Sequence, residues 1–410
     1  MTSTVKISTP QPQLPAFDSS WQDWMAYGLA WRRLEHANVA SSWAASTSPA
    51  TSTSPGTSWS ESDWPSSVAP AVADAASAKR SWPITFHAYR EPTPGPRWQA
   101  LWDATRSAYR GFYLSEGEAA RPSLQECREA LEQHMPEMVP AWERLTALAT
   151  DDEHDDDIAA RLLSMWRMPI FAAGCSQVAL PGTDPVLVRN YDYDPNLFEG
   201  VIASTNYSGS RAVLGTSDML WGLVDGMNDA GLAISLTYGG RKGGKAGFGI
   251  PLVIRYLLET CTTVSQACER LRGLPVAQAY NLAMVDTDGA HATVFVAPGE
   301  EPEVSDLRVS TNHRLGQVEH PDTAARFGSL DRQQFLAGNL EDGDPTQDLL
   351  GDWFADAPVH NDRYSEGFGT LYTVAYRPQH GEATYTWGDT VLTRTFADGE
   401  ATVPVVLQGR

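Results

Sequence analysis

The chain of 410 residues is long enough for two or three domains, or for one large domain with extensions. Its net charge of −21 repels phosphate backbones, so we expect no nucleic acid partner. No apolar run approaches the roughly 18 residues of a membrane span, and residues 1–14 lack the apolar segment of a secretory signal. We therefore expect a cytoplasmic protein that does not bind membranes.

The first 80 residues differ in composition from the rest of the chain. Residues 24–34 can form one short helix, but residues 40–78 are rich in Ser, Thr, Ala and Pro and have no periodicity. Such a segment cannot bury enough apolar surface to offset its conformational entropy. We predict that residues 1–80 form a largely disordered tail.

Residues 81–174 are predicted to form a mainly helical leader. Residues 83–87 read as a short strand, and Ser123 with Glu126 forms a capping box that opens a helix. The predicted helices span residues 98–113 and 124–134, a segment from Pro136 or Pro140 through Leu148, and a segment from Ile158 onward.

An acidic cluster at residues 151–157 precedes the last of these helices. Carboxylates there favour the positive end of a helix dipole. Consecutive acids point in different directions and do not converge on one ion, so we predict a solvated helix start instead of a metal site. We expect no cofactor elsewhere in the chain.

From residue 169 the pattern changes to short strands separated by Gly, Asp and Asn turns. Helices are predicted at residues 251–261, 264–271 and near 323–336. Strands, then two helices, then more strands indicate an α+β layered sandwich and not a βαβ winding. The predicted strands span residues 171–178, 185–191, 201–206, 211–215, 231–238, 281–286, 291–296, 308–311, 370–376, 383–387 and 394–396.

The four cysteines form no C-x-x-C pair and are too few for a disulfide framework. We expect three of them, Cys127, Cys261 and Cys268, to be buried as small apolar residues. Cys175 differs, because Gly174 precedes it and an arginine and an aspartate follow within one β-excursion.

We therefore consider Cys175 as a nucleophile, which requires a lowered thiol pKa or an adjacent base. Arg189 supplies a permanent positive charge, and Asp192 can orient an amine or a cation. No histidine is close in sequence, so a histidine base would have to be a distant one such as His313 or His360.

Cleavage of the Gly174–Cys175 bond would provide a different base. The new α-amino group of Cys175 would have a pKa near 8 and could accept the proton of its own thiol. Gly174 suits this reaction, since without a Cβ it permits a close approach of its carbonyl to the thiol.

One geometric difficulty concerns the strand that carries Arg189 and Asp192. Side chains alternate along a strand, so these two residues face opposite sides. We expect the strand to end or bulge near Tyr191, ahead of the turn signal at residues 194–196, if both are to reach Cys175.

Six short motifs, in order, resemble those of the acyl-coenzyme A:6-aminopenicillanic acid acyltransferase family, the C45-type autoproteolytic branch of the N-terminal-nucleophile hydrolases. The chain is also distantly similar to choloylglycine hydrolases and penicillin V acylases. The resemblance covers residues 174 to about 378, and the segment from about residue 98 resembles the one that precedes the nucleophile. The motifs are residues 174–176, 189–192, 225–233, 248–251, 310–313 and 369–373.

This resemblance implies a four-layer αββα sandwich at residues 175–410, preceded by the helical leader as a propeptide or small chain. It implies Cys175 as the nucleophile after cleavage at Gly174–Cys175, with Arg189 and Asp192 flanking the thiol and the amine. Two further residues are implied as oxyanion donors: Asn312, and Tyr238 or its neighbour Thr237.

The resemblance also implies a late active-site arginine, for which Arg326 is the best match and Arg332 is nearby. The implied activity is that of a cysteine amide hydrolase or acyltransferase that acts on non-peptide C–N bonds through an acyl-thioester. Its expected partner is a small-molecule amide or acyl-coenzyme A-type substrate, and we expect both chains to stay associated after cleavage.

Three alternatives remain open. Residues 239–246 fit the phosphate-binding pattern G-x-x-x-x-G-K, but Ala246 stands where a hydroxyl should hold Mg²⁺, so we predict a loop at the rim of the active site. A catalytically inactive binding protein of the same fold would need none of the residues Cys175, Arg189, Asp192 and Asn312. An uncleaved cysteine hydrolase would use a histidine base, with His313 as the candidate.

Overall fold

The computed structural model describes residues 80–149, 157–169, 174–241, 244, 246–314, 318, 320–341, 343 and 345–409. The predicted tail up to residue 79, its helix at residues 24–34 and the acidic residues 151–156 lie outside this range. Among the described residues, no helix is both long enough and apolar enough to cross a membrane.

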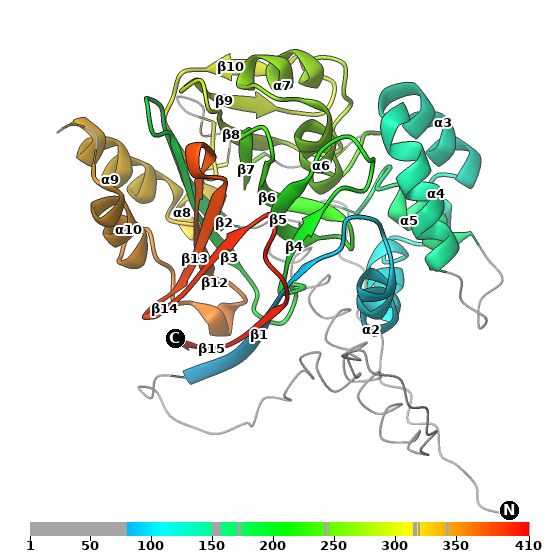
Figure 1. The fold of residues 1–410 in the computed structure, drawn as a ribbon, viewed down its shortest axis with the longest axis horizontal. Coiled ribbons are helices and arrows are strands. Elements are labelled where there is room, and N and C mark those ends of the chain that lie inside the picture. Colours follow the sequence, from blue (N-terminus) through cyan, green and yellow to red (C-terminus); the bar gives the residue numbers. More distant parts are fainter. Residues whose placement is uncertain are drawn as a thin grey trace, which may run out of the picture.

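Two β-sheets form the centre of the molecule (Figure 1). The larger sheet has nine strands in the order β10-β9-β8-β7-β6-β5-β4-β1-β15. Neighbouring strands pair antiparallel, except that β1 runs parallel to β4. In this order the strands are Glu303–Ser305, His291–Val296, Tyr280–Val285, Ala233–Tyr238, Gly222–Asn228, Val213–Asp218, Val201–Thr205, Arg80–Arg90 and Ala401–Gly409.

The smaller sheet has six strands in the order β11-β2-β3-β12-β13-β14. Its strands β2 and β3 face β7 and β8 of the larger sheet, and the Gln177 side chain joins the two layers. Gln177 Oε1 accepts from Ser235 Oγ at 2.6 Å, and its Nε2 donates to the Asn281 carbonyl at 3.1 Å. The strands are Val309–Ser310, Gly174–Leu180, Val186–Tyr193, Gly369–Arg377, Glu382–Trp387 and Thr390–Thr395.

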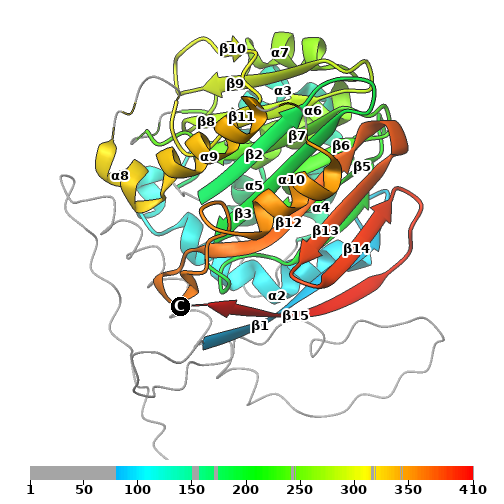
Figure 2. The same ribbon diagram turned by 90° about the vertical axis from the view of Figure 1, so that its left-hand side faces the viewer.

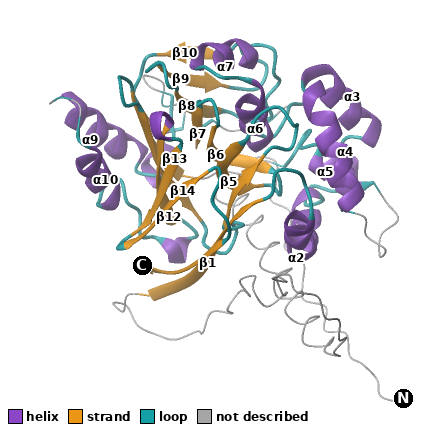
Figure 3. Ribbon diagram, in the orientation of Figure 1, coloured by secondary structure: helices purple, strands orange, loops and turns teal. Residues whose placement is uncertain are grey.

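Helices cover the outer face of each sheet (Figures 1 and 3). Helix α6 (Ile250–Thr260) packs on β5, β6 and β7, and α7 (Val264–Leu271) packs on β9. On the other side α9 (Ser329–Glu341) and α10 (Gln347–Ala355) lie across the six-stranded sheet (Figure 2), with the short α8 (Pro321–Arg326) beside α9. The structure therefore confirms the predicted α+β architecture with four αββα layers.

The period-2 alternation of β2 and β3 assigns their side chains to two layers. Val178, Val186 and Val188 pack with Leu336 and Phe354 of the covering helices, in a small apolar cluster separate from the main core. Cys175 and Tyr191 belong to the larger core between the sheets. Both faces of these strands are therefore buried.

The leader contributes helices and also one strand of the core. Helices α2 (Pro96–Tyr113), α3 (Leu124–His134), α4 (Val139–Leu148) and α5 (Ile158–Leu163) form a group beside α6 (Figure 1). Trp98 Nε1 donates to the Leu220 carbonyl at 3.0 Å, which ties α2 to the turn between β5 and β6. Strand β1 lies between β4 and β15, so the leader is built into the larger sheet.

Local signals locate several elements correctly. Helix α3 begins after Ser123 with both hydrogen bonds of the predicted capping box, and α7 has the predicted bounds. The helix predicted near residues 323–336 is instead divided into α8 and α9, because Gly328 adopts a positive φ of 59° between them. Strands β6, β10 and β15 and helix α10 were not predicted.

Candidate active site

Cys175 is the second residue of β2 and is fully buried. It lies opposite Tyr191 of β3, while its neighbour Gly174 lies opposite Asp192. Because paired residues share a face, Cys175 and Arg189 point toward the nine-stranded sheet, and Gly174 and Asp192 point toward the helical layer. Arg189 and Asp192 therefore lie on opposite faces of the six-stranded sheet, on either side of the backbone of Cys175.

Arg189 contacts the thiol directly. Its Nη2 donates to Cys175 Sγ at 3.2 Å, and its Nη1 donates to Asp225 Oδ2 at 2.5 Å. Asp225 in turn accepts from Tyr372 Oη and Tyr376 Oη, each at 2.6 Å. This network holds the guanidinium in one orientation against the sulfur. No role for Asp225 was predicted from the sequence.

Burial raises the pKa of the Cys175 thiol above its ordinary value. The positive charge of Arg189 and the backbone N–H of Asp192 act in the opposite direction but do not cancel that effect. In the intact chain the thiol is therefore protonated at neutral pH, and it needs a base to become a nucleophile.

Asp192 lies opposite Gly174 in the pairing of β2 with β3. Its Oδ1 accepts from Thr370 Oγ1 at 2.7 Å, whereas its buried Oδ2 has no hydrogen-bond partner within the described part of the chain. Burial raises the pKa of this carboxyl to about 6, and the positive charge of Arg332 limits the rise. The carboxylate thus has one oxygen available beside the Gly174–Cys175 junction.

Strand β3 does not bend at Tyr191, so the predicted end or bulge there is wrong. The register with β2 is regular from Gly174 to Leu180, and the irregularity lies in β12, between Thr370 and Tyr372. No bend is needed, because Arg189 reaches the sulfur from one face and Asp192 approaches the backbone from the other.

Asn312 connects the nucleophile to two other segments. Its Oδ1 accepts from the Cys175 backbone N–H at 3.0 Å and from Arg332 Nη2 at 2.7 Å. Its Nδ2 donates to the Tyr238 carbonyl at 3.2 Å. The amide group therefore lies directly beside the junction.

The structure places Arg332, not Arg326, at the site. Arg332 is buried and donates to the Cys175 carbonyl and, at 2.6 Å, to Ser176 Oγ. The Arg326 carbonyl accepts from Arg363, and among the described contacts its side chain makes none with Cys175 or Asn312. Arg332 reaches the site because the chain breaks at Gly328 and a new helix, α9, begins there. Arg332 lies in the first turns of α9, which packs on β2.

Tyr238 approaches the site differently from the expectation. Its carbonyl accepts from Asn312, and its phenolic oxygen donates to the Arg241 carbonyl at 2.7 Å. The neighbouring Thr237 donates through Oγ1 to the Thr311 carbonyl at 2.7 Å. Tyr238 is therefore linked to Cys175 through Asn312. Thr237 is linked through Thr311, the residue before Asn312 in the chain.

The histidine alternative has no geometric support. His313 Nδ1 lies 2.8 Å from Ser329 Oγ and 3.3 Å from Thr311 Oγ1. Burial and the charge of Arg332 lower the pKa of His313, which makes it a weaker base. Burial also lowers the pKa of His360. Within the described residues, no histidine contacts the Cys175 thiol.

The prediction that the other three cysteines are buried is confirmed for two of them and is wrong for Cys268. Cys127 and Cys261 are buried and Cys268 is half-buried, and burial raises the pKa of all three thiols. Residues 80–149, 157–169 and the later described segments contain no group of three or more His, Cys, Asp or Glu side chains that could hold a metal ion.

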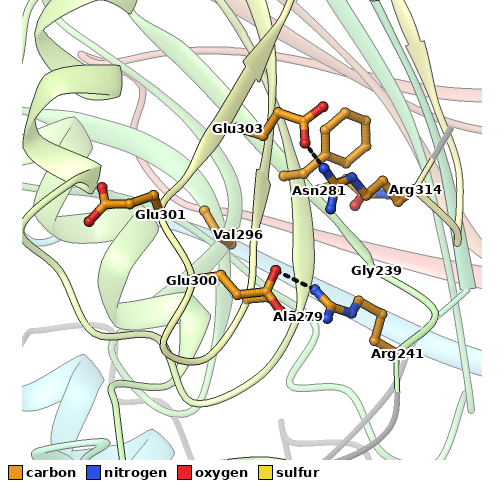
Figure 4. A pocket seen from close by; sticks show the side chains of 11 residues that line it. Gly239, Arg241, Ala279, Asn281, Val296, Glu300, Glu301, Glu303 and Arg314 are labelled. Carbon is orange, nitrogen blue, oxygen red and sulfur yellow. Dashed lines mark hydrogen bonds and ion pairs between the residues drawn. The ribbon is translucent and has the colours of Figure 1, made fainter. Parts of the chain in front are cut away.

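A small pocket adjoins the Asn312 segment (Figure 4). It has a volume of about 80 Å³ and is lined by Gly239 and Asn281, with the ion pairs Arg241–Glu300 and Arg314–Glu303 across it. A Cβ on Gly240 would lie 2.4 Å from the Asn312 carbonyl oxygen, so the glycine-rich loop starts against the site. Residues 242, 243 and 245 of this loop lie outside the described range.

The same loop does not have the setting of a nucleotide-binding loop. It follows β7, and the next strand after α6 and α7 is β8, which pairs antiparallel with β7. A phosphate-binding loop of that kind requires a parallel βαβ unit.

Two facing sheets between helical layers, with a cysteine at the start of a central strand, are the architecture of N-terminal-nucleophile hydrolases. The family model described as acyl-coenzyme A:6-aminopenicillanic acid acyl-transferase matches residues 179–391, more than half of the chain. The protein belongs to this family, whose description names an acyl-transferase activity. The match begins just after Cys175 and includes Arg189, Asp192 and Asn312.

Comparison with solved structures finds similar chains at low identity. A mutant of the conjugated bile acid hydrolase from Clostridium perfringens is 15% identical over 56% of this chain and 96% of its own, with a TM-score of 0.38. Penicillin V acylase from Agrobacterium tumefaciens is 16% identical over 56% and 90%, with a TM-score of 0.37. The N-acylethanolamine-hydrolyzing acid amidase ortholog of Caenorhabditis elegans is 14% identical over 50% and 92%, with a TM-score of 0.37. No curated protein sequence matches.

We expect Arg332→Gln to lower kcat/KM at least about tenfold, since it removes charge-assisted hydrogen bonds to Cys175 and Asn312. Arg326→Gln is the matched control, at the end of the preceding helix, and should retain nearly the parental value. Steady-state kinetics of both variants, with melting curves to verify folding, test the assignment. A larger loss in Arg326→Gln than in Arg332→Gln would contradict it.

Proposed function

We propose that the protein cleaves itself at Gly174–Cys175 and then acts as an amide hydrolase or acyltransferase on non-peptide C–N bonds. The observation that carries this proposal is the position of the Cys175 thiol. Arg189 contacts it at 3.2 Å, and Asp192, which lies opposite Gly174, has a carboxylate oxygen with no hydrogen-bond partner among the described residues. Positive charge at the sulfur and negative charge at the nitrogen suit a thiol nucleophile that uses its own amine.

In the self-cleavage, Cys175 Sγ attacks the carbonyl carbon of Gly174. A C–S bond forms, the C–N bond breaks, and the proton lost by the thiol is taken up by the nitrogen, which becomes the α-amine of Cys175. Water then hydrolyses the thioester, which leaves a carboxylate on Gly174 and restores the thiol. The raised pKa of the buried thiol in the intact chain is consistent with this order, because the α-amine that would act as its base forms only on cleavage.

In turnover the α-amine accepts the thiol proton as Sγ attacks the substrate carbonyl. The amine part of the substrate takes that proton and leaves, and the acyl group remains on Cys175 as a thioester. Water or a second amine then accepts the acyl group. Asp192 would hold the α-ammonium form through its available oxygen, and Arg189 would favour the thiolate.

Asn312 and Arg332 are proposed to organise the carbonyl side of the reaction. Asn312 Oδ1 accepts from the Cys175 N–H in the intact chain, and Nδ2 donates one of its two N–H groups to the Tyr238 carbonyl. The other N–H of Nδ2 is the group proposed to donate to the developing oxyanion. Tyr238 is proposed to support Asn312 through its carbonyl and to provide the second oxyanion contact from the same loop.

The small chain is proposed to remain bound after cleavage. Strand β1 is paired along nine residues with β15 and along four with β4. The helices of the small chain add buried aromatic side chains, including Trp98, Trp142 and Tyr113. Separation of the chains would expose all of these surfaces together.

Intact-mass analysis of the purified protein between pH 5 and pH 8 tests the proposal. We expect two chains, residues 1–174 and 175–410. Because the Asp192 carboxyl has a pKa of about 6, it is ionised above that pH, and the cleavage rate should rise as the pH increases through about 6. A single full-length mass at every pH would refute self-cleavage.

Asp192→Asn is the matched variant for this profile. It should cleave at least about tenfold more slowly and lose the rise near pH 6. The same substitution should stabilise the fold at pH 7. A carboxyl whose pKa is raised by folding destabilises the folded state when it ionises, and asparagine cannot ionise. Asp192→Asn should therefore melt at a higher temperature than the wild type at pH 7. Slow cleavage with a lower melting temperature would indicate structural damage instead.

A further inference from the structure

Phe368 fills the space that a side chain at position 174 would occupy. A Cβ built on Gly174 would lie 2.0 Å from both Cε2 and Cζ of the Phe368 ring, and 3.4 Å from Asp192 Cβ. Real Cβ contacts are never as short as 2.0 Å, so either the ring or the strand would have to move. The clash lies on the carbon next to the proposed scissile carbonyl.

The Phe368 ring is held from several sides. It packs against Phe327 with ring centroids 4.9 Å apart, and the Arg363 guanidinium lies 5.0 Å from its centre. The Phe368 N–H also donates to the Arg363 carbonyl at 3.2 Å. Phe327 and Phe368 are only 3% and 6% exposed, so both rings are packed inside the protein and not at its surface. A branch at position 174 is therefore excluded by a fixed wall.

The same wall faces the acyl group in turnover, which follows from the proposed function. Self-cleavage joins the Gly174 carbonyl to Sγ, and turnover joins the substrate carbonyl to the same Sγ. The two thioesters have the same bonds, so Gly174 Cα corresponds to the α-carbon of the substrate acyl group. What Phe368 excludes at Gly174 it also excludes at that carbon.

We infer that Phe368 rejects acyl groups whose α-carbon has a substituent in the position of the Cβ of an L-residue. Amides of straight-chain or otherwise α-unsubstituted acids are accepted. Amides of L-α-amino acids with side chains, and of the enantiomer of each α-methyl acid that places its methyl group in that position, are rejected. The selection depends on the shape of one ring and not on charge, since Phe368 and Phe327 are apolar.

Self-processing gives the first test, with intact mass as the readout. Wild type and Gly338→Ala should cleave alike, because a Cβ on Gly338 of α9 meets nothing within 4 Å. Gly174→Ala should cleave at least tenfold more slowly, and Gly174→Ala with Phe368→Ala should recover most of the wild-type rate. Phe368→Ala alone should still cleave.

The outcomes separate the two proposals. An uncleaved wild type would overturn self-cleavage, and this inference with it. Cleavage of Gly174→Ala at the wild-type rate, or no recovery in the double variant while Phe368→Ala cleaves, would overturn the inference alone.

Turnover gives the second test, with 4-nitroanilides of straight-chain acids from acetyl to decanoyl. From pentanoyl upward, each is compared with the single enantiomer of its 2-methyl isomer whose methyl group takes the position of the Cβ of an L-residue. The cleaved wild type should prefer the best straight-chain amide over its isomer at least tenfold in kcat/KM. Phe368→Ala should reduce this preference to less than threefold. Equal turnover of both isomers by the wild type, or turnover of no straight-chain amide, would overturn the assignment.

Discussion

Cys175→Ala is expected to remain one uncleaved chain and to turn over no amide. The substitution removes the sulfur that Arg189 contacts and leaves Cys127, Cys261 and Cys268, which lie outside the site. Loss of a nucleophile from a group of residues that act together lowers kcat by a factor on the order of 10⁴ or more. Intact mass and an amide-hydrolysis assay measure the two effects independently.

Cys268→Ala is the matched control, because it removes a half-buried thiol on α7. It should cleave and turn over substrate like the wild type. A Cys175→Ala chain that is cut at residue 174 would assign the cleavage to another protease. One that is uncut but retains activity would rule out Cys175 as the nucleophile.

Arg189→Ala is expected to abolish most activity and also to destabilise the fold. Arg189 and Asp225 are both fully buried, and loss of their 2.5 Å ion pair would leave Asp225 as an uncompensated charge. Breaking a buried pair on one side costs about 3–5 kcal/mol. A fall in the free energy of unfolding alone would therefore not demonstrate a catalytic role.

The double variant Arg189→Leu with Asp225→Asn separates stability from catalysis. It removes both charges, so much of the lost stability should return. Activity should remain at least about a hundredfold below the wild type, since the thiol still lacks its positive neighbour. Chemical denaturation and kcat/KM measure the two quantities, and recovery of activity along with stability would show that Arg189 is only structural.

The sequence was informative where the controlling interactions are local. The capping box at Ser123 and the period-2 pattern of β3 depend on residues a few positions apart, and both are found as predicted. Alternation also placed Arg189 and Asp192 on opposite faces, although it could not show that the backbone of Cys175 lies between those faces.

Tertiary pairing decided the parts that were missed. Strand β15 contains Pro404 and alternates exposed with buried residues at a sheet edge, and its partner β1 lies at the other end of the described chain. The choice between Arg326 and Arg332 depended on the helix break at Gly328. Asp225 acquires its importance only through Arg189, Tyr372 and Tyr376, which come from two other strands.

The position of β1 sets an order of events during biosynthesis. Arg80 of β1 pairs with Gly409 of β15, at the two ends of the range that the structure describes, and within that range β15 pairs only with β1. Thr370, which holds Asp192, also comes late in the chain. The chain must therefore have left the ribosome at least as far as Thr370 before the contacts around the junction at Gly174 are complete. The proposed cleavage would then occur only in chains that have folded, because chains truncated before Thr370 lack a residue that holds Asp192.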